Sequence, residues 1–76
     1  MEQNEFIVNF AEQFDETDAS EIQSSTGFHD LEEWSSLTAM SVIALAKIQY
    51  GKSITVAEIK SCITVQDLYN LIKNKL

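Results

Sequence analysis

Two adjacent serines, Ser35 and Ser36, stand immediately before the most apolar segment of the chain. A serine oxygen at such a place can cap the backbone N–H groups that begin a helix, which is its commonest role. An exposed hydroxyl there can also accept a covalently attached group. A phosphate on it would lie beside unpaired N–H groups and the positive end of the helix dipole. On this pattern alone, capping is the commoner role for Ser36.

The other reactive side chains are isolated from one another. Cys62 is the only cysteine, so an internal disulfide and a zinc cluster are excluded, and His29 is the only histidine. Glu32 and Glu33 are adjacent carboxylates in a segment predicted to be a surface loop, where such side chains usually face solvent. We therefore expect no catalytic residue and no metal site, and predict that the protein is not an enzyme.

Size and charge limit the function further. A chain of 76 residues forms a single domain, residues 1–76, which buries only about 60% of its unfolded surface and has little room for a deep active site. The formal net charge is −7, from twelve acids and five lysines with no arginine, which disfavours nucleic acid and anionic membranes as partners. Residues 1–33 hold ten acids and no lysine, whereas residues 34–76 hold five lysines and two acids. This dipolar layout could orient a docking partner.

The sequence shows no secretory signal pattern, and its longest apolar run, residues 42–46, is far too short to cross a bilayer. We expect a soluble, cytoplasmic monomer without membrane insertion.

Helices are the expected elements, because the chain has no proline and only two glycines, Gly27 and Gly51. Apolar spacing predicts helices over residues 4–14, 37–50 and 54–61. A last helix follows Thr64, which with Asp67 forms a capping-box pattern. The apolar stripe of that helix comprises Val65, Leu68, Leu71, Ile72 and Leu76.

Residues 15–26 are polar and predict a long surface loop with a helical turn near residues 19–23. In the stretch that follows, Phe28, Leu31 and Trp34 recur three apart and are expected to pin the loop to the core. Loops of this length in small domains are uncommon unless they serve function.

The segment 37–50 has more apolar surface than one buried stripe needs. It could be a central helix covered on most sides. Part of the excess, Leu37, Met40 and Ala44, could instead form an exposed docking patch. The two interpretations are compatible.

The string WSSL and the sequence after it resemble the acyl carrier protein family, whose modified serine lies in a D-S-L motif opening the second helix of a four-helix bundle. Downstream of Ser36 follow the apolar helix, Tyr50, Ile54, a short helix and the I-T-V-Q stretch of residues 63–66. Upstream, the pattern formed by Phe28, Leu31 and Trp34 resembles that of free-standing bacterial carriers, which have a tryptophan just before the motif. The resemblance covers about residues 28–72, and the first helix only by pattern.

The resemblance implies an all-α, four-helix bundle of acyl-carrier type with a long loop after helix 1 and a short third helix. It implies that Ser36 bears 4′-phosphopantetheine, transferred from coenzyme A by a phosphopantetheinyl transferase, with acyl or aminoacyl groups carried as thioesters. Leu37 sets the motif register, so Ser35 is the substituted neighbour. Cys62 falls where the family has a buried aliphatic residue, which implies a core thiol. Expected partners are an acyl- or aminoacyl-activating ligase and acyltransferase-type enzymes.

Two departures from the family pattern shape the functional hypothesis. Ser35 replaces the family's aspartate, and the second helix holds no acid, although carriers of the fatty-acid type expose several there. We therefore expect docking through the apolar patch and through an upstream acidic cluster comprising Asp30, Glu32 and Glu33. A dedicated biosynthetic pathway is favoured over general fatty-acid synthesis. The alternative is a non-carrying helical interaction module with the same fold that binds a partner through helix 2.

Overall fold

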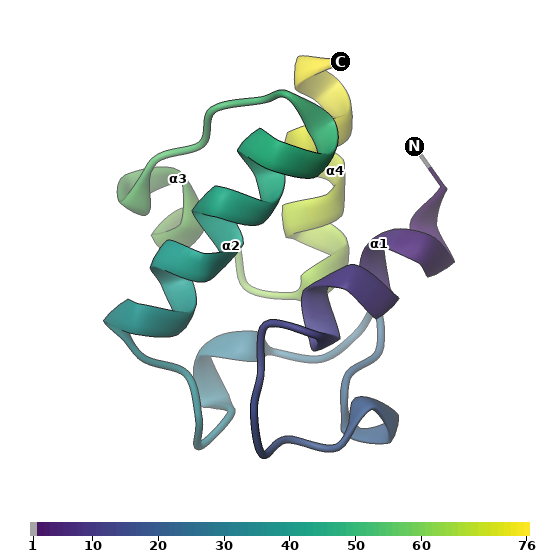
Figure 1. Cartoon of the computed structure of the whole chain (residues 1–76), viewed down its shortest axis with the longest axis vertical. Helices are drawn as coiled ribbons and strands as arrows, with labels where there is room; N and C mark the ends of the chain where they lie inside the picture. The colour runs from purple at the N-terminus through teal and green to yellow at the C-terminus, as the bar shows by residue number, and fades with distance from the viewer. Residues whose placement is uncertain (1) are drawn as a thin grey trace.

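The computed structural model describes residues 2–76, in which four α-helices surround one aromatic-rich core (Figure 1). The helices are α1 (Gln3–Ala11), α2 (Ser36–Tyr50), α3 (Val56–Ser61) and α4 (Val65–Lys75). Helix α1 contacts α2 and α4, while the short α3 lies against α2. The predicted all-α bundle, with its long loop after the first helix and its short third helix, is confirmed.

The helix boundaries follow local capping. Helix α2 ends at Tyr50 and is capped by Gly51, whose φ of 67° is left-handed and whose N–H donates to the Lys47 carbonyl. This geometry requires glycine because a Cβ is strained at such a φ. Helix α3 begins at Val56 and not at residue 54, because Thr55 and Glu58 form a capping box that sets its start. The predicted box of Thr64 and Asp67 is confirmed at the start of α4.

Two of the predicted helices extend too far at their C-terminal ends. Helix α1 ends at Ala11, because the N–H groups of Gln13 and Phe14 donate to carbonyls three residues back and tighten the chain into a turn. Phe14 nevertheless stays buried. At the other end, Leu76 lies beyond α4 and is 57% exposed, so its predicted place in the apolar stripe was wrong.

The core gathers side chains from all four helices and from the long loop. The predicted pinning residues behave as expected in part: Phe28 is fully buried, while Leu31 and Trp34 are half-buried and pack against the core. The largest fully buried side chains are Phe6, Phe10, Phe28, Ile59, Leu68, Ile72, Val42 and Val65.

The loop between α1 and α2 closes the lower end of the molecule in Figure 1. It contains the 3₁₀ helices Ala19–Glu21 and Phe28–Asp30, the first of which matches the predicted helical turn. Its middle is tied to the start of α4 by hydrogen bonds from the N–H of Val65 to the Thr26 carbonyl and from that of Gln66 to the Ser24 carbonyl. These hydrogen bonds fix the position of the loop, and therefore the position from which the chain enters α2.

Candidate functional site

The two serines at the start of α2 have different roles. Ser35 is the N-cap, and its Oγ accepts a hydrogen bond from the Thr38 N–H at 3.4 Å. Thr38 is buried and donates through its own hydroxyl to the Glu33 carbonyl at 3.1 Å. The interpretation of Ser36 as merely an N-cap is therefore wrong, because its neighbour occupies that position.

Ser36 is the first residue of α2, and its side chain is exposed. Within residues 2–76 its hydroxyl has no hydrogen-bond partner. No acid lies in the first turn of α2, so an anion held there meets no carboxylate from that turn. The backbone N–H groups of a first helical turn lack helical acceptors and favour negative charge nearby. The position suits an attached phosphate.

An aromatic cluster holds the chain just before this start. The Trp34 ring packs on Phe28 at a centroid distance of 4.8 Å and on Phe14 at 6.3 Å. His29 stacks on Phe28, and its Nε2 lies 2.9 Å from the Cys62 carbonyl oxygen. Because a carbonyl only accepts, Nε2 carries the hydrogen. His29 thus ties the loop to the end of α3, a role that its isolation in the sequence did not suggest.

A groove of about 420 Å³ opens beside Ser36, between the start of α2 and α3. Its floor and walls are mainly apolar, and its one lysine, Lys60, comes from α3. The lining residues are His29, Trp34, Ser35, Ser36, Ala39, Met40, Val56, Ile59 and Lys60.

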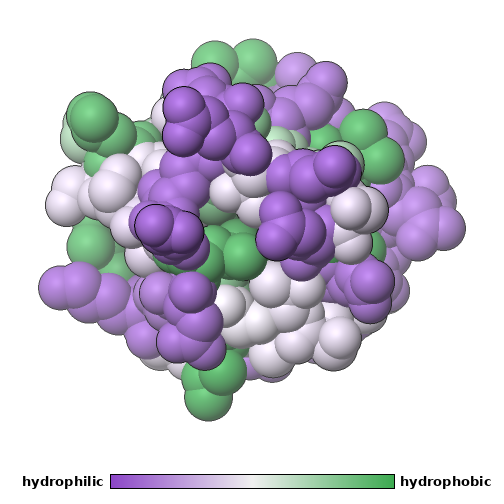
Figure 2. Space-filling view, turned by 90° about the horizontal axis from the view of Figure 1, so that it is seen from below, coloured by the Kyte–Doolittle hydropathy of each residue, from purple (hydrophilic) through white to green (hydrophobic). Residues whose placement is uncertain are grey.

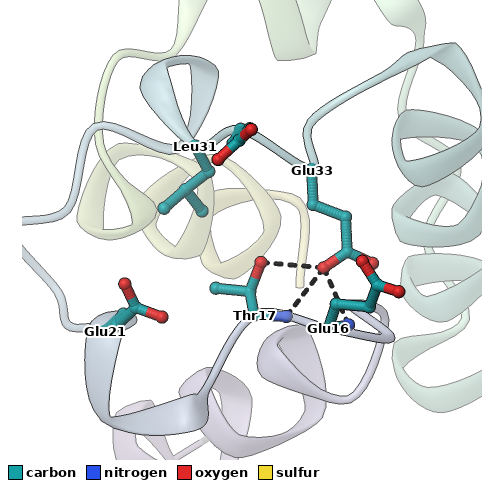
Figure 3. A pocket seen from close by; sticks show the side chains of 6 residues that line it. Glu16, Thr17, Glu21, Leu31 and Glu33 are labelled. Atoms are coloured by element: carbon teal, nitrogen blue, oxygen red, sulfur yellow. Dashed lines mark hydrogen bonds between the residues drawn. The ribbon is translucent and has the colours of Figure 1, made fainter.

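The upstream acidic cluster does not act as one unit. Glu33 folds back onto the beginning of the loop and accepts hydrogen bonds from the N–H groups of Asp15, Glu16 and Thr17 and from the Thr17 hydroxyl. Figure 3 shows those from Glu16 and Thr17. The expectation that Glu33 simply faces solvent was therefore wrong. Asp30 and Glu32 are exposed. The sequence carried no signal for this tether, because its partners lie 16 to 18 residues away.

Hydrogen bonding also sets the ionisation of Glu33. Desolvation acts to raise its pKa, but the hydrogen bonds from Thr17 and from the three backbone N–H groups outweigh it. The pKa of Glu33 therefore lies below the ordinary glutamate value, and the tether is intact at neutral pH. Figure 2 shows this end of the molecule, where hydrophilic side chains predominate around a small apolar hollow.

The three residues of the predicted apolar docking patch on α2 are exposed to solvent. Leu37 is 78% exposed, Met40 is 63% exposed, and Ala44 is also exposed. The structure adds Ile48 on the same helix and Val56 on α3 to the exposed apolar surface. Helical spacing from Leu37 and Ala44 could have identified Ile48, whereas Val56 required knowing where α3 packs.

Cys62 is buried, as predicted, and desolvation, aided by the negative charge of Asp67, raises the pKa of its thiol. No cluster that could hold a metal ion occurs within residues 2–76. None of the helices described is long and apolar enough to cross a membrane.

Comparison with known protein families now defines the class of protein. The family model for the phosphopantetheine attachment site matches residues 5–72, which is nearly the whole chain. The protein belongs to this family of carrier proteins, whose members bear 4′-phosphopantetheine covalently. No curated protein and no solved structure matches the chain. The hydroxyl at the start of α2 is exposed and has no hydrogen-bond partner within residues 2–76, which is compatible with this covalent group.

Proposed function

We propose that Ser36 is the attachment residue and that residues 1–76 act as one carrier domain, a monomer that moves acyl or aminoacyl groups between enzymes of a dedicated biosynthetic pathway. The observation that carries this proposal is the contrast between the two serine hydroxyls. That of Ser35 is engaged in capping, whereas that of Ser36 is exposed and free to react. When bound, the phosphopantetheine group supplies a terminal thiol that holds cargo as a thioester.

The chain's own residues perform the remaining tasks. Ser35 and Thr38 fix the start of α2, so the Ser36 hydroxyl is presented at a constant place to a phosphopantetheinyl transferase. The first-turn N–H groups and the helix dipole stabilise the attached phosphate by about 0.3–1 kcal/mol, which steadies the arm without immobilising it. The protein itself performs no catalysis in this scheme. An activating ligase loads it and an acyltransferase-type enzyme unloads it.

Docking of these enzymes is assigned to two surfaces next to Ser36. The first is the apolar patch comprising Leu37, Met40 and Ala44, which is exposed along one side of α2. Large exposed apolar side chains that lie together are typical of interaction sites. The second is the acidic cluster comprising Asp30, Glu32 and Glu33, in which Asp30 and Glu32 have the more accessible carboxylates.

Intact-mass spectrometry tests the attachment. The wild type, Ser36→Ala and Ser35→Ala are each incubated with coenzyme A, Mg²⁺ and a broad-specificity transferase. We expect the wild type and Ser35→Ala to gain the mass of one phosphopantetheine group, and Ser36→Ala to gain none. Circular dichroism of each variant checks that the fold is retained.

Either of two results would overturn the proposal. Modification of Ser36→Ala would place the arm elsewhere. An unmodified wild type, under conditions that modify a control carrier, would instead favour a non-carrying module that binds its partner through α2.

A further inference from the structure

The exposed side of α2 combines apolar residues with positive charge. At 100° per residue, the exposed positions Ser36, Lys47, Met40, Ala44, Leu37 and Ile48 fall in that order within an arc of about 120°. Helix α2 contains no carboxylate, and Lys47 is its only charged residue. Across the groove, α3 adds the exposed residues Val56 and Lys60. We call this surface, with Lys52 from the connection between the two helices, the α2–α3 face.

The lysines of this face are not neutralised within the part of the chain that the structure describes. Lys47, Lys52 and Lys60 form no ion pair there. The two lysines of α4 are engaged instead. Lys75 pairs with Glu58 at 2.9 Å, and Lys73 lies 5.8 Å from the centroid of the Tyr69 ring.

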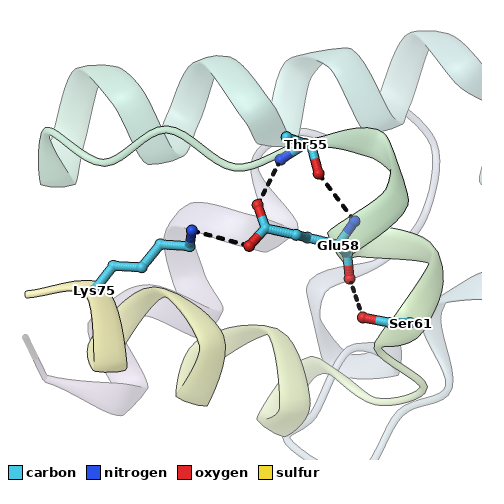
Figure 4. A network of polar contacts seen from close by, with 4 residues as sticks. All are labelled: Thr55, Glu58, Ser61 and Lys75. Carbon is cyan, nitrogen blue, oxygen red and sulfur yellow. Dashed lines mark hydrogen bonds and ion pairs between the residues drawn. The ribbon is translucent and has the colours of Figure 1, made fainter.

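Glu58 is the only acid within residues 36–61, and its position is already determined by other contacts (Figure 4). One of its oxygens accepts from the Thr55 N–H at 2.9 Å, and the other receives the Lys75 ion pair. Glu58 therefore links α3 to α4, and it does not neutralise the positive charge of Lys60. The α2–α3 face is locally positive on a protein whose net charge is −7.

The acids that produce the net charge lie elsewhere. Ten of the twelve belong to residues 2–33, most of which form α1 and the long loop, at the right and lower sides of Figure 1. Helix α3 lies at the opposite, left side. At physiological ionic strength, charges more than about 8 Å apart are largely screened, so a docked surface responds mainly to the lysines it touches.

We propose that the α2–α3 face binds a partner-enzyme surface whose apolar centre is flanked by carboxylates. This inference rests on the proposed carrier function and specifies the chemistry of the partner. The apolar side chains supply contact area, while the three lysines favour acidic partners and reject basic ones. The acidic loop at the other side of Ser36 has the opposite preference, so the two charges together set the orientation in which an enzyme approaches the arm.

Two synthetic helical peptides serve as probes. They share one apolar stripe, flanked by glutamates in the first peptide and by lysines in the second. Each is titrated into the ¹⁵N-labelled protein, and amide shifts are followed for Met40, Ala44, Val56 and Lys60. We expect the glutamate peptide to shift these amides with an affinity at least tenfold higher than the lysine peptide, and the preference to weaken as salt is raised.

Charge-reversal variants make the test specific to the face. Lys60→Glu should abolish most of the preference for the glutamate peptide. Lys73→Glu changes the net charge equally but lies on α4, outside the face, and should preserve the preference. The net charge alone predicts the reverse result, because a protein at −7 attracts the lysine peptide.

The proposal is overturned if the lysine peptide shifts the α2–α3 amides as strongly as the glutamate peptide, or if neither peptide shifts them. Loading of Ser36 is measured separately by mass. A protein that loads normally but shows no acidic preference would refute the partner chemistry and leave the carrier function standing.

Discussion

Ser35 and Ser36 are neighbours in the sequence, but their hydroxyl groups have different environments. Ser35 replaces the aspartate that carriers usually have at this place, and the structure shows that it retains a capping function, because its oxygen reaches the Thr38 N–H. Serine and aspartate are both strong N-cap residues. The substitution therefore preserves the start of α2 while removing a negative charge beside Ser36.

Alanine substitutions at the two serines should have unequal effects on stability. Ser35→Ala removes the cap of α2 and should lower the free energy of unfolding by about 1 kcal/mol. Ser36→Ala changes an exposed side chain that has no hydrogen-bond partner in the described part of the chain, and it should alter the free energy of unfolding by less than about 0.5 kcal/mol. Urea unfolding followed by circular dichroism measures both values. A larger loss in Ser36→Ala would contradict the capping assignment.

Among the elements, the long loop depends most on a single side chain. Glu33 lies just before α2, and its carboxylate accepts hydrogen bonds from three successive N–H groups of residues 15–17. Because these donors follow the end of α1, Glu33 couples the exit of one helix to the entry of the next. The loop is long, but its ends are held together.

Replacing Glu33 should loosen this coupling. In Glu33→Gln the acceptor loses its charge, and we expect the amides of Asp15, Glu16 and Thr17 to exchange with solvent several-fold faster at neutral pH. Hydrogen exchange followed by NMR measures the effect. Glu32→Gln is the matched control, because the Glu32 side chain is exposed and makes no hydrogen bond within residues 2–76. Equal exchange in the two variants would refute the tether.

The stability that Glu33 contributes should depend on pH. The pKa of Glu33 is lower in the folded state than in the unfolded chain, so its stabilising contribution is complete above the ordinary glutamate pKa. The contribution is lost as the pH falls through the lowered, folded-state pKa. The difference in unfolding free energy between the wild type and Glu33→Gln should therefore be largest near neutrality and shrink in acid.

The whole molecule is held by one core in which aromatic rings from α1 and the loop meet. Phe10 is fully buried and packs against Phe6, Phe14 and Phe28 at centroid distances of 6.2, 5.3 and 5.8 Å. A domain of this size has a total stability of about 4–11 kcal/mol, at roughly 0.05–0.15 kcal/mol per residue. A single core residue therefore controls a large share of it.

Phe10→Ala should reduce the free energy of unfolding by about 3–5 kcal/mol, because it removes buried surface and leaves a cavity. Val8→Ala, in the same helix but at a position that is 59% exposed, should change it by less than about 0.5 kcal/mol. Chemical denaturation of both variants measures the contrast. Similar losses would mean that α1 does not anchor the core as described.

The sequence alone predicted the parts of this protein that depend on neighbours a few residues apart. Apolar spacing indicated all four helices. The capping box at Thr64 was predicted correctly as well, because a cap is set by residues within one helical turn. The spacing around Ser36 also indicated the family, since its motif runs along the chain.

Only the tertiary structure decided which polar groups meet across the chain. It placed the Glu33 carboxylate on residues 15–17 and His29 on the end of α3, and it paired Glu58 with Lys75, so that Lys60 has no ion pair within residues 2–76. These contacts join residues 16 to 33 positions apart. Periodicity carries no information about such pairs, because their meeting depends on how the helices pack and not on the residues beside them.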